Sequence, residues 1–355
     1  MTAPDNEHTS LLAKAIALGE EVSHDLVKNA EGVKQGRPLD DFQAQVPGTR
    51  GVVRSEYGQE IHWYEPDHRT DGGRQRSAPR PEFLLIHGLG LTHRVWRFQQ
   101  EALAQQARVV AIDLRGHGDS PVAPQAQSMY EGMGRDVAAV VEQLDMRNAF
   151  VCGHSIGGMS MLQFAVDHPE VVAERVSGLI ALSTTATGRN FLTTRAPVLA
   201  RQIAKAVDHT VEPDLVRKIV ALRSGKITDT EIGFMAFREM FGENAEENAV
   251  EFSREMTASL SPAGMDQALK AMFGYKVTDE LRDLDVETLV LHGKRDRLLP
   301  PSEGELLAAT LPRADFVPVD GAGHMLMYEE TKLVTSLLRE FASEVLTGVS
   351  PRASG

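Results

Sequence analysis

The chain has 355 residues, of which 42% are hydrophobic and 25% are charged, as expected for one large globular domain or a domain with an insertion. Its net charge of −13 argues against a nucleic-acid partner, because phosphate binding needs a basic surface. Cys152 is the single cysteine, so an intrachain disulfide is excluded. The sequence has no basic segment followed by a long apolar stretch and no run of 18 apolar residues, so we expect a soluble, cytoplasmic protein.

Residues 1–48 are predicted to form an N-terminal helical extension. Apolar residues recur in it at helical spacing, at Leu11, Ala15, Leu18, Val22 and Leu26. We expect this helix to dock on the main body or on a second copy of the chain, which would make a homo-oligomer. The extension carries too few basic residues to favour a helix lying on a membrane surface.

From residue 49 onward, short apolar runs alternate with helical patterns. Two strands are predicted within residues 51–65, on either side of a turn at Tyr57-Gly58. Six buried strands are predicted at Phe83–Ile86, Val109–Ile112, Ala149–Cys152, Leu179–Leu182, Thr288–Leu291 and Phe316–Val319. Helices are predicted at Glu131–Leu144, Met159–His168 and Thr331–Val345. This alternation predicts an α/β protein whose mostly parallel sheet is flanked by helices.

The alternation stops after the sixth strand. Between Leu182 and Thr288 the sequence shows helical periodicity and no convincing strand. We therefore predict a core at 49–185, a helical cap at 186–278, a second core segment at 279–347 and a C-terminal tail at 348–355. The cap is rich in Met and Phe, which suits either an adaptable apolar pocket wall or the cap's own core.

The segment VCGHSIGG, residues 151–158, contains a G-x-S-x-G motif between a predicted strand and a predicted helix. A turn that lifts Ser155 above the strand end must be very tight. Gly153 and Gly157 fit this turn, because side chains at these two positions would clash with each other. The alternative is a helix N-cap serine with incidental glycines.

A serine nucleophile needs a base, and the base needs an acid to hold it. Both residue types follow later in the chain, each just past a predicted strand. Asp296 ends the segment LVLHGKRD, and His324 ends the glycine-rich segment VDGAGH, which precedes the last helix. The three residues Ser155, Asp296 and His324 are therefore the predicted catalytic triad.

From about residue 50 to its end, the chain resembles the α/β-hydrolase superfamily. The order Ser155, Asp296, His324 matches that family's order of triad residues. The segment LIHGLG at 85–90 resembles its His-Gly loop, and DLRGHGDS at 113–120 resembles its Asp-x-x-Gly-x-Gly-x-Ser segment. The resemblance implies that the backbone N–H groups of Leu89 and Ile156 form the oxyanion hole.

The remaining histidines near these motifs are interpreted as structural. His292 precedes Asp296 in its strand-end segment, and His117 lies in a glycine-rich turn together with Asp119. His87 is expected to shape the oxyanion loop through hydrogen bonds, and His154, next to the nucleophile, could shape the pocket.

Two other positions were candidates for the acid. Asp285 precedes its strand and would lie at the wrong end of the sheet. Some family members place the acid after an earlier strand, but that position here reads Ser183-Thr184-Thr185 and has no carboxylate. Asp296 is therefore preferred.

The resemblance implies a serine hydrolase that cleaves carboxylic esters of mainly apolar substrates, leaning toward the esterase and monoacylglycerol-lipase-like branch. Thioesterase, lactonase, carbon–carbon-bond hydrolase and perhydrolase activities remain open on the same triad, as does a non-catalytic binding protein. No cofactor is expected, since the G-x-G turns at 88–90 and 116–118 lack the rest of a dinucleotide fingerprint. No metal is expected, because H-E-x-x-H and spaced Cys/His clusters are absent from the sequence.

Overall fold

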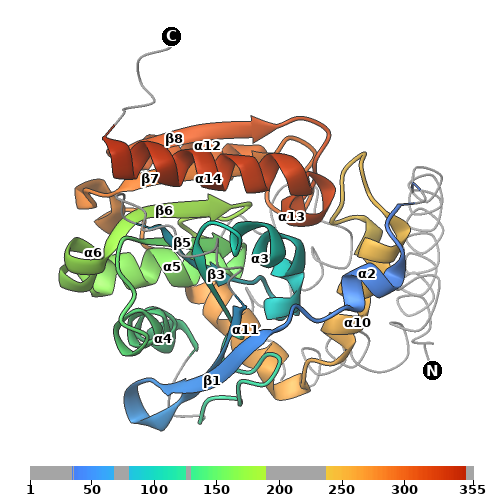
Figure 1. Ribbon diagram of the computed structural model, residues 1–355. Coiled ribbons are helices and arrows are strands. Elements are labelled where there is room, and N and C mark those ends of the chain that lie inside the picture. The colour runs from blue at the N-terminus through green and yellow to red at the C-terminus, as the bar shows by residue number, and fades with distance from the viewer. Residues whose placement is uncertain (1–33, 35, 68–79, 125–128, 189–236, 349–355) are drawn as a thin grey trace, which may run out of the picture.

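The computed structural model describes residues 34, 36–67, 80–124, 129–188 and 237–348. The predicted extension helix between Leu11 and Leu26 and the cap residues 189–236 lie outside this range. At its centre is an eight-stranded sheet with the order β1-β2-β4-β3-β5-β6-β7-β8 (Figure 1). Strands β1 (Gly48–Arg54) and β2 (Glu60–Pro66) form an antiparallel hairpin, and β2 is also antiparallel to β4.

The other strand pairs are all parallel. These strands are β3 (Glu82–Ile86), β4 (Arg108–Ile112), β5 (Ala149–His154), β6 (Val176–Leu182), β7 (Glu287–Gly293) and β8 (Ala314–Val319). The short helices are α2 (Leu39–Gln43), η1 (Glu56–Gly58), η2 (His93–Trp96), α3 (Arg97–Leu103), α6 (Pro169–Arg175), η5 (Glu280–Asp283) and α13 (Leu326–Glu329). The longer helices are α4 (Met129–Gln143), α5 (Ile156–Asp167), α10 (Glu247–Ala258), α11 (Pro262–Gly274), α12 (Pro301–Thr310) and α14 (Thr331–Thr347).

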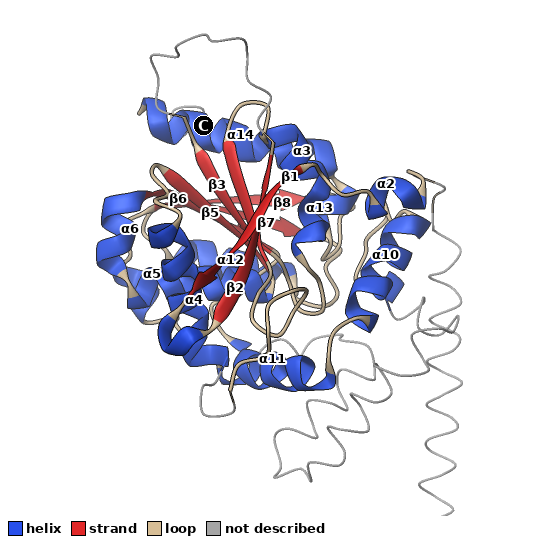
Figure 2. Ribbon diagram, turned by 60° about the horizontal axis from the view of Figure 1, so that its bottom comes forward, coloured by secondary structure: helices blue, strands red, loops and turns tan. Residues whose placement is uncertain are grey.

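Helices cover both faces of the sheet, as Figure 2 shows. Neighbouring residues of one strand enter two different cores, because successive side chains point to opposite faces. In β3, for example, Leu84 and Ile86 pack with α4 and α5, whereas Phe83 and Leu85 pack with α3 and α14. The predicted mostly parallel sheet flanked by helices is confirmed.

The predicted insertion leaves the sheet after β6 and returns at β7. These two strands are adjacent and parallel, so the insertion is an excursion between neighbours that leaves the sheet intact. Among its described residues, the main elements are the helices α10 and α11, and α11 packs on α4. The helices found after the sixth strand agree with the predicted helical cap.

The described end of the N-terminal extension docks on the body of the protein. Phe42 is 1% exposed, and its ring lies 5.2 Å from that of Phe98 and 5.3 Å from that of Tyr328. The Arg37 guanidinium donates to the Glu246 carboxylate at 2.7 Å and to the Tyr328 carbonyl at 2.8 Å. Because Glu246 precedes α10 and Tyr328 lies in α13, this arginine ties the extension to cap and core together. No helix among the described residues is long and apolar enough to cross a membrane.

A buried ion pair joins the segment after β4 to helix α4. The Arg115 guanidinium donates to both oxygens of Asp136, at 2.6 and 2.7 Å, and both side chains are at most 3% exposed. We expect Asp136→Ala to lower the free energy of unfolding by about 3–5 kcal/mol, because it leaves the arginine charge buried without its partner. Urea denaturation would measure this difference.

The exposed pair of Arg54 and Glu60 is the control, with side chains 70% and 37% exposed. Glu60→Ala should cost less than about 1 kcal/mol, since water screens the pair. Equal costs for the two substitutions would contradict the importance of burial at Asp136.

Candidate active site

Ser155 occupies a sharp turn between the end of β5 and the start of α5. Its backbone has φ 54° and ψ −119°, a conformation that is strained for a residue with a side chain. Two hydrogen bonds of the Ser155 backbone stabilise this strained conformation. Its N–H donates to the Leu182 carbonyl at 3.0 Å, and its carbonyl accepts from Thr184 Oγ1 at 2.7 Å. The serine therefore lies at the carboxyl edge of the sheet, where α5 begins.

Both predicted glycines are required by close backbone approach, although for a reason that differs from the expected clash between their side chains. A Cβ at Gly153 would lie 2.4 Å from the Gly157 carbonyl oxygen. A Cβ at Gly157 would lie 2.4 Å from the Ile86 carbonyl oxygen of β3. The second glycine thus lets the turn at residues 153–157, called the elbow below, pack on the neighbouring strand.

Asp296 and His324 meet although 27 residues separate them in the chain. The carboxylate Oδ2 lies 2.8 Å from His324 Nδ1, and both side chains are buried. The other oxygen, Oδ1, accepts from the N–H groups of Leu298 and Leu299, each at 2.9 Å. Burial opposes ionisation of Asp296, but the neighbouring His324 and His292 outweigh it and hold the pKa of this carboxyl well below its usual range.

The elbow and the histidine loop touch each other through His154. Its Nε2 lies 2.9 Å from the His324 carbonyl oxygen, and the two rings are 4.8 Å apart between centroids. The neighbour of Ser155 therefore packs directly against His324. Among the described residues no hydrogen bond joins the Ser155 hydroxyl to the imidazole, and such bonds are often long before substrate binds.

The loop after β3 lies against the same turn. A Cβ at Gly88 would come within 3.2 Å of Ser155 Cβ. His87 is fully buried, which lowers its pKa to about 3, so its imidazole is neutral. Its Nε2 accepts from the Leu114 N–H at 3.0 Å, and its Nδ1 donates to the Gly88 carbonyl at 2.8 Å. Because a trans peptide is planar, fixing that carbonyl also fixes the direction of the Leu89 N–H.

Cap helix α10 contacts this loop directly. Thr257 Oγ1 donates to the Gly90 carbonyl at 3.0 Å, and Thr92 Oγ1 lies 3.5 Å from the Met256 sulfur. Most described Met and Phe side chains of the cap are buried in the two cores: Phe237, Phe241, Phe252, Met256, Met265 and Met272. For these residues the structure favours the cap's own core over a pocket wall.

The segment Asp113–Ser120 is stabilised by hydrogen bonds within it and to His93. The Asp113 carboxylate accepts from the N–H of His93 at 2.7 Å and from the N–H of Asp119 at 3.0 Å. His117 is buried, and its Nδ1 lies 3.1 Å from the Arg115 carbonyl oxygen. These contacts agree with the structural roles expected for His117 and Asp119.

Two buried or mostly buried carboxylates near this edge of the sheet were not expected from the sequence. Glu329 of α13 accepts from the N–H groups of Gly323 and Met325, which flank His324, and from that of Gly242 in the cap. Glu303 of α12 accepts from Thr185 Oγ1 at 2.5 Å, so a carboxylate does lie just after β6. No local motif marks either residue, because Glu303 bonds to Thr185 and Glu329 to Gly242, both remote in the sequence. Although these two carboxylates lie nearby, the His324 ring bonds to Asp296.

Protonation of Glu329 should make the stability of the protein depend on pH. Burial raises the pKa of this carboxyl to about 7 despite the three backbone N–H donors, from an ordinary value near 4.5. Below pH 4.5 the folded and unfolded states both hold the proton. As pH rises from there through 7, only the unfolded state ionises readily, so the wild type should lose stability.

We therefore expect the thermal midpoint of the wild type to fall relative to Glu329→Gln between pH 5 and 8. Thermal denaturation at unit steps of pH would measure this difference. Glu330→Gln is the control, since Glu330 accepts from Asn244 beside the same loop. The midpoint of this variant should still fall with rising pH, because the variant retains Glu329. Parallel curves for wild type and Glu329→Gln would contradict the expected titration.

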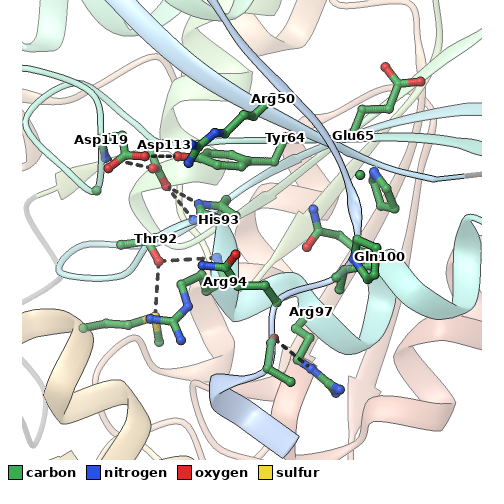
Figure 3. Close-up of a pocket in the computed structure, with 18 of the residues that line it drawn as sticks. Arg50, Tyr64, Glu65, Thr92, His93, Arg94, Arg97, Gln100, Asp113 and Asp119 are labelled. Atoms are coloured by element: carbon green, nitrogen blue, oxygen red, sulfur yellow. Dashed lines mark hydrogen bonds and ion pairs between the residues drawn. The ribbon is translucent and has the colours of Figure 1, made fainter.

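A pocket of about 850 Å³ lies beside η2, which follows the loop after β3 (Figure 3). Residues 44–50, β2, η2 and α10 line it, and the stacked rings of Tyr64 and His93 form one wall. None of Ser155, Asp296 and His324 lines this pocket. In the described part of the chain, no group of three or more His, Cys, Asp or Glu side chains could hold a metal ion.

The family model for the alpha/beta hydrolase fold matches residues 81–331, which include the elbow and the Asp296–His324 pair. The chain belongs to the α/β-hydrolase family. It is accordingly a hydrolase.

Among the similar relatives of this α/β hydrolase is the AB hydrolase superfamily protein YisY of Bacillus subtilis. It is 26% identical over 73% of this chain and 91% of its own length. The pimeloyl-[acyl-carrier protein] methyl ester esterase of Aeromonas hydrophila is 24% identical over 75% of this chain and 97% of its own length. The solved structure of a thermophilic esterase from Thermogutta terrifontis is 27% identical, has a TM-score of 0.57, and covers 84% of this chain and 99% of that chain.

Proposed function

We propose that this hydrolase cleaves carboxylic esters through an acyl-enzyme formed on Ser155. The observation that carries the proposal is the strained Ser155 turn beside the buried Asp296–His324 pair at one edge of the sheet. The two esterases among its relatives support ester bonds as the substrate class.

In the proposed reaction, His324 takes the Ser155 proton as the serine oxygen attacks the ester carbonyl. Asp296 keeps the Nδ1 proton of His324 in place and stabilises the imidazolium that forms. The N–H groups of Leu89 and Ile156 bind the oxyanion; Ile156 is the first residue of α5, so its N–H has no partner within the helix. The alcohol leaves with the proton from His324, and water then repeats the steps to release the acid.

The mainly apolar nature of the substrate is the finer part of the proposal. It rests on the family resemblance, since the described Met and Phe residues of the cap are buried in the cores. Thioesterase, lactonase, carbon–carbon-bond hydrolase and perhydrolase activities would use the same three residues. The small-molecule ester is the proposed partner, and no cofactor takes part in the proposed steps.

Labelling by a fluorophosphonate probe tests the activated serine. We expect the wild type to be labelled and Ser155→Ala to remain unlabelled. Ser160→Ala is a matched control, because Ser160 lies on α5 with its hydroxyl bonded to the Ile156 carbonyl at 3.0 Å. That variant should be labelled like the wild type.

Hydrolysis of a series of esters from short to long acyl chains then tests the apolar preference. Catalytic efficiency that rises with chain length would support it, and a flat or falling profile would count against it. A folded wild type that takes no label would count against the acyl-enzyme and favour a binding protein on this fold.

A further inference from the structure

His292 lies at the carboxyl end of β7, four residues before Asp296, and its side chain is completely buried. Its Nε2 lies 3.0 Å from the Leu299 carbonyl oxygen and 3.3 Å from Asp296 Oδ2. Both neighbours are acceptors, so the proton of the imidazole is on Nε2 and this atom donates. His292 was expected to be structural, but its side chain contacts the proposed catalytic acid.

The two histidines approach the same oxygen. Oδ1 of Asp296 is taken by two backbone N–H groups, as described above, and Oδ2 lies 2.8 Å from His324 Nδ1 as well as 3.3 Å from His292 Nε2. A second donor on Oδ2 draws away negative charge that would otherwise act on His324 alone. It also restricts the rotation of the Asp296 carboxylate.

The ring of His292 packs closely on α12. A Cβ at Gly304 of α12 would lie only 2.6 Å from its Nδ1, and that atom has no hydrogen-bond partner. The charged groups around the ring are Asp296 on its own loop and the buried Glu303 on α12. On the neighbouring strand β8, the residue paired with His292 is Pro318, which carries no charge. Burial alone would lower the pKa of His292, but its bond to Asp296 outweighs this and raises it.

We propose that His292 is a positioning residue for the triad: its Nε2–H holds the Asp296 carboxylate and shares the charge of Oδ2 with His324. The inference rests on the proposed function of Ser155, Asp296 and His324. Without this donor, Asp296 would turn more freely, and more negative charge on Oδ2 would favour the protonated form of His324. The base would then be lost at a higher pH than in the wild type.

Three substitutions separate the donor from mere packing. In His292→Gln the side-chain nitrogen can take the place of Nε2, whereas in His292→Asn it reaches only the place of Nδ1, and His292→Leu has no donor. We expect His292→Gln to keep kcat/KM within about twofold of the wild type. His292→Asn and His292→Leu should lose about tenfold, the value of one hydrogen bond to a charged group, and their acid limb of kcat/KM should move to higher pH.

Thermal denaturation of each variant shows whether it folds. If His292→Leu does not fold, comparing His292→Gln with His292→Asn still tests whether a donor at the Nε2 position is needed. His117→Gln is the control, because His117 is also buried and contacts Arg115 but none of the three triad residues. Its acid limb should match that of the wild type.

Equal activity and an unchanged acid limb in all three variants would overturn the inference, and so would an equal loss in all three without a shift of that limb. Fluorophosphonate labelling distinguishes a failure of the proposed function from a failure of the role of His292. A wild type without label defeats the proposed function itself, whereas a labelled wild type with a flat His292 series defeats only the role of His292.

Discussion

Replacing Ser155 by alanine is expected to lower kcat for ester hydrolysis by about six orders of magnitude, as removal of a triad serine does elsewhere. The variant has no oxygen to form the acyl-enzyme, and only the oxyanion donors and substrate binding remain. The fold should survive, because the Ser155 hydroxyl makes no hydrogen bond with the described residues and its backbone contacts do not depend on the side chain. Steady-state kinetics and thermal denaturation of the same preparation would measure both effects.

Ser160→Ala again provides the comparison, since it removes a hydroxyl from α5, the helix that follows Ser155. It should retain activity close to that of the wild type. A folded Ser155→Ala protein that hydrolyses the ester at more than a hundredth of the wild-type rate would defeat the assignment of the nucleophile.

Asp296→Asn is expected to lower kcat by about four orders of magnitude through the wrong histidine tautomer. The new amide oxygen should stay at the Oδ1 position, because the N–H groups of Leu298 and Leu299 donate there. Its NH₂ group then faces His324 Nδ1, which must become an acceptor. The imidazole proton moves to Nε2, and this nitrogen can no longer take the serine proton. The pH dependence and size of kcat would measure this loss.

Asp285→Asn is the matched control for this substitution. Asp285 precedes β7 at the opposite end of the strand, its side chain is 80% exposed, and it pairs with Arg313 at 3.4 Å. We expect no change in kcat. If Asp296→Asn kept more than a tenth of the wild-type activity, the catalytic acid would have to be sought elsewhere, and the buried Glu303 beside Thr185 would be the next residue to test.

Local patterns in the sequence were sufficient for the sheet and its helices. Buried strands such as Phe83–Ile86 were predictable because four apolar residues in a row mark a strand covered on both faces. The turn around Ser155 was predictable because its glycines lie within two residues of the serine. The reason why glycine is needed in this turn was predictable only in part. The contact that excludes a side chain at Gly157 comes from β3, about 70 residues earlier in the chain.

The contacts around the proposed triad could not be predicted in the same way. Glu329 joins the His324 loop to Gly242 of the cap, and Arg37 reaches Glu246 across 209 residues. His292 looked structural because its spacing from Asp296 does not reveal that both side chains turn toward one another. Such pairings depend on how loops leave the sheet, and no period or motif in the sequence records that geometry.

The sequence alone determined the α/β class of this protein, the order of its strands along the chain and the choice of Ser155, Asp296 and His324 as candidates. These features depend on neighbouring residues, whose hydrophobic period and turn chemistry can be read directly. The tertiary structure alone decided the spatial order of the strands and the contact of His324 with Asp296. It also decided the positions of His292, which donates to Asp296, and of the carboxylates Glu303 and Glu329. It could do so because parallel strands bring their carboxyl ends to one edge, where segments remote in sequence become neighbours.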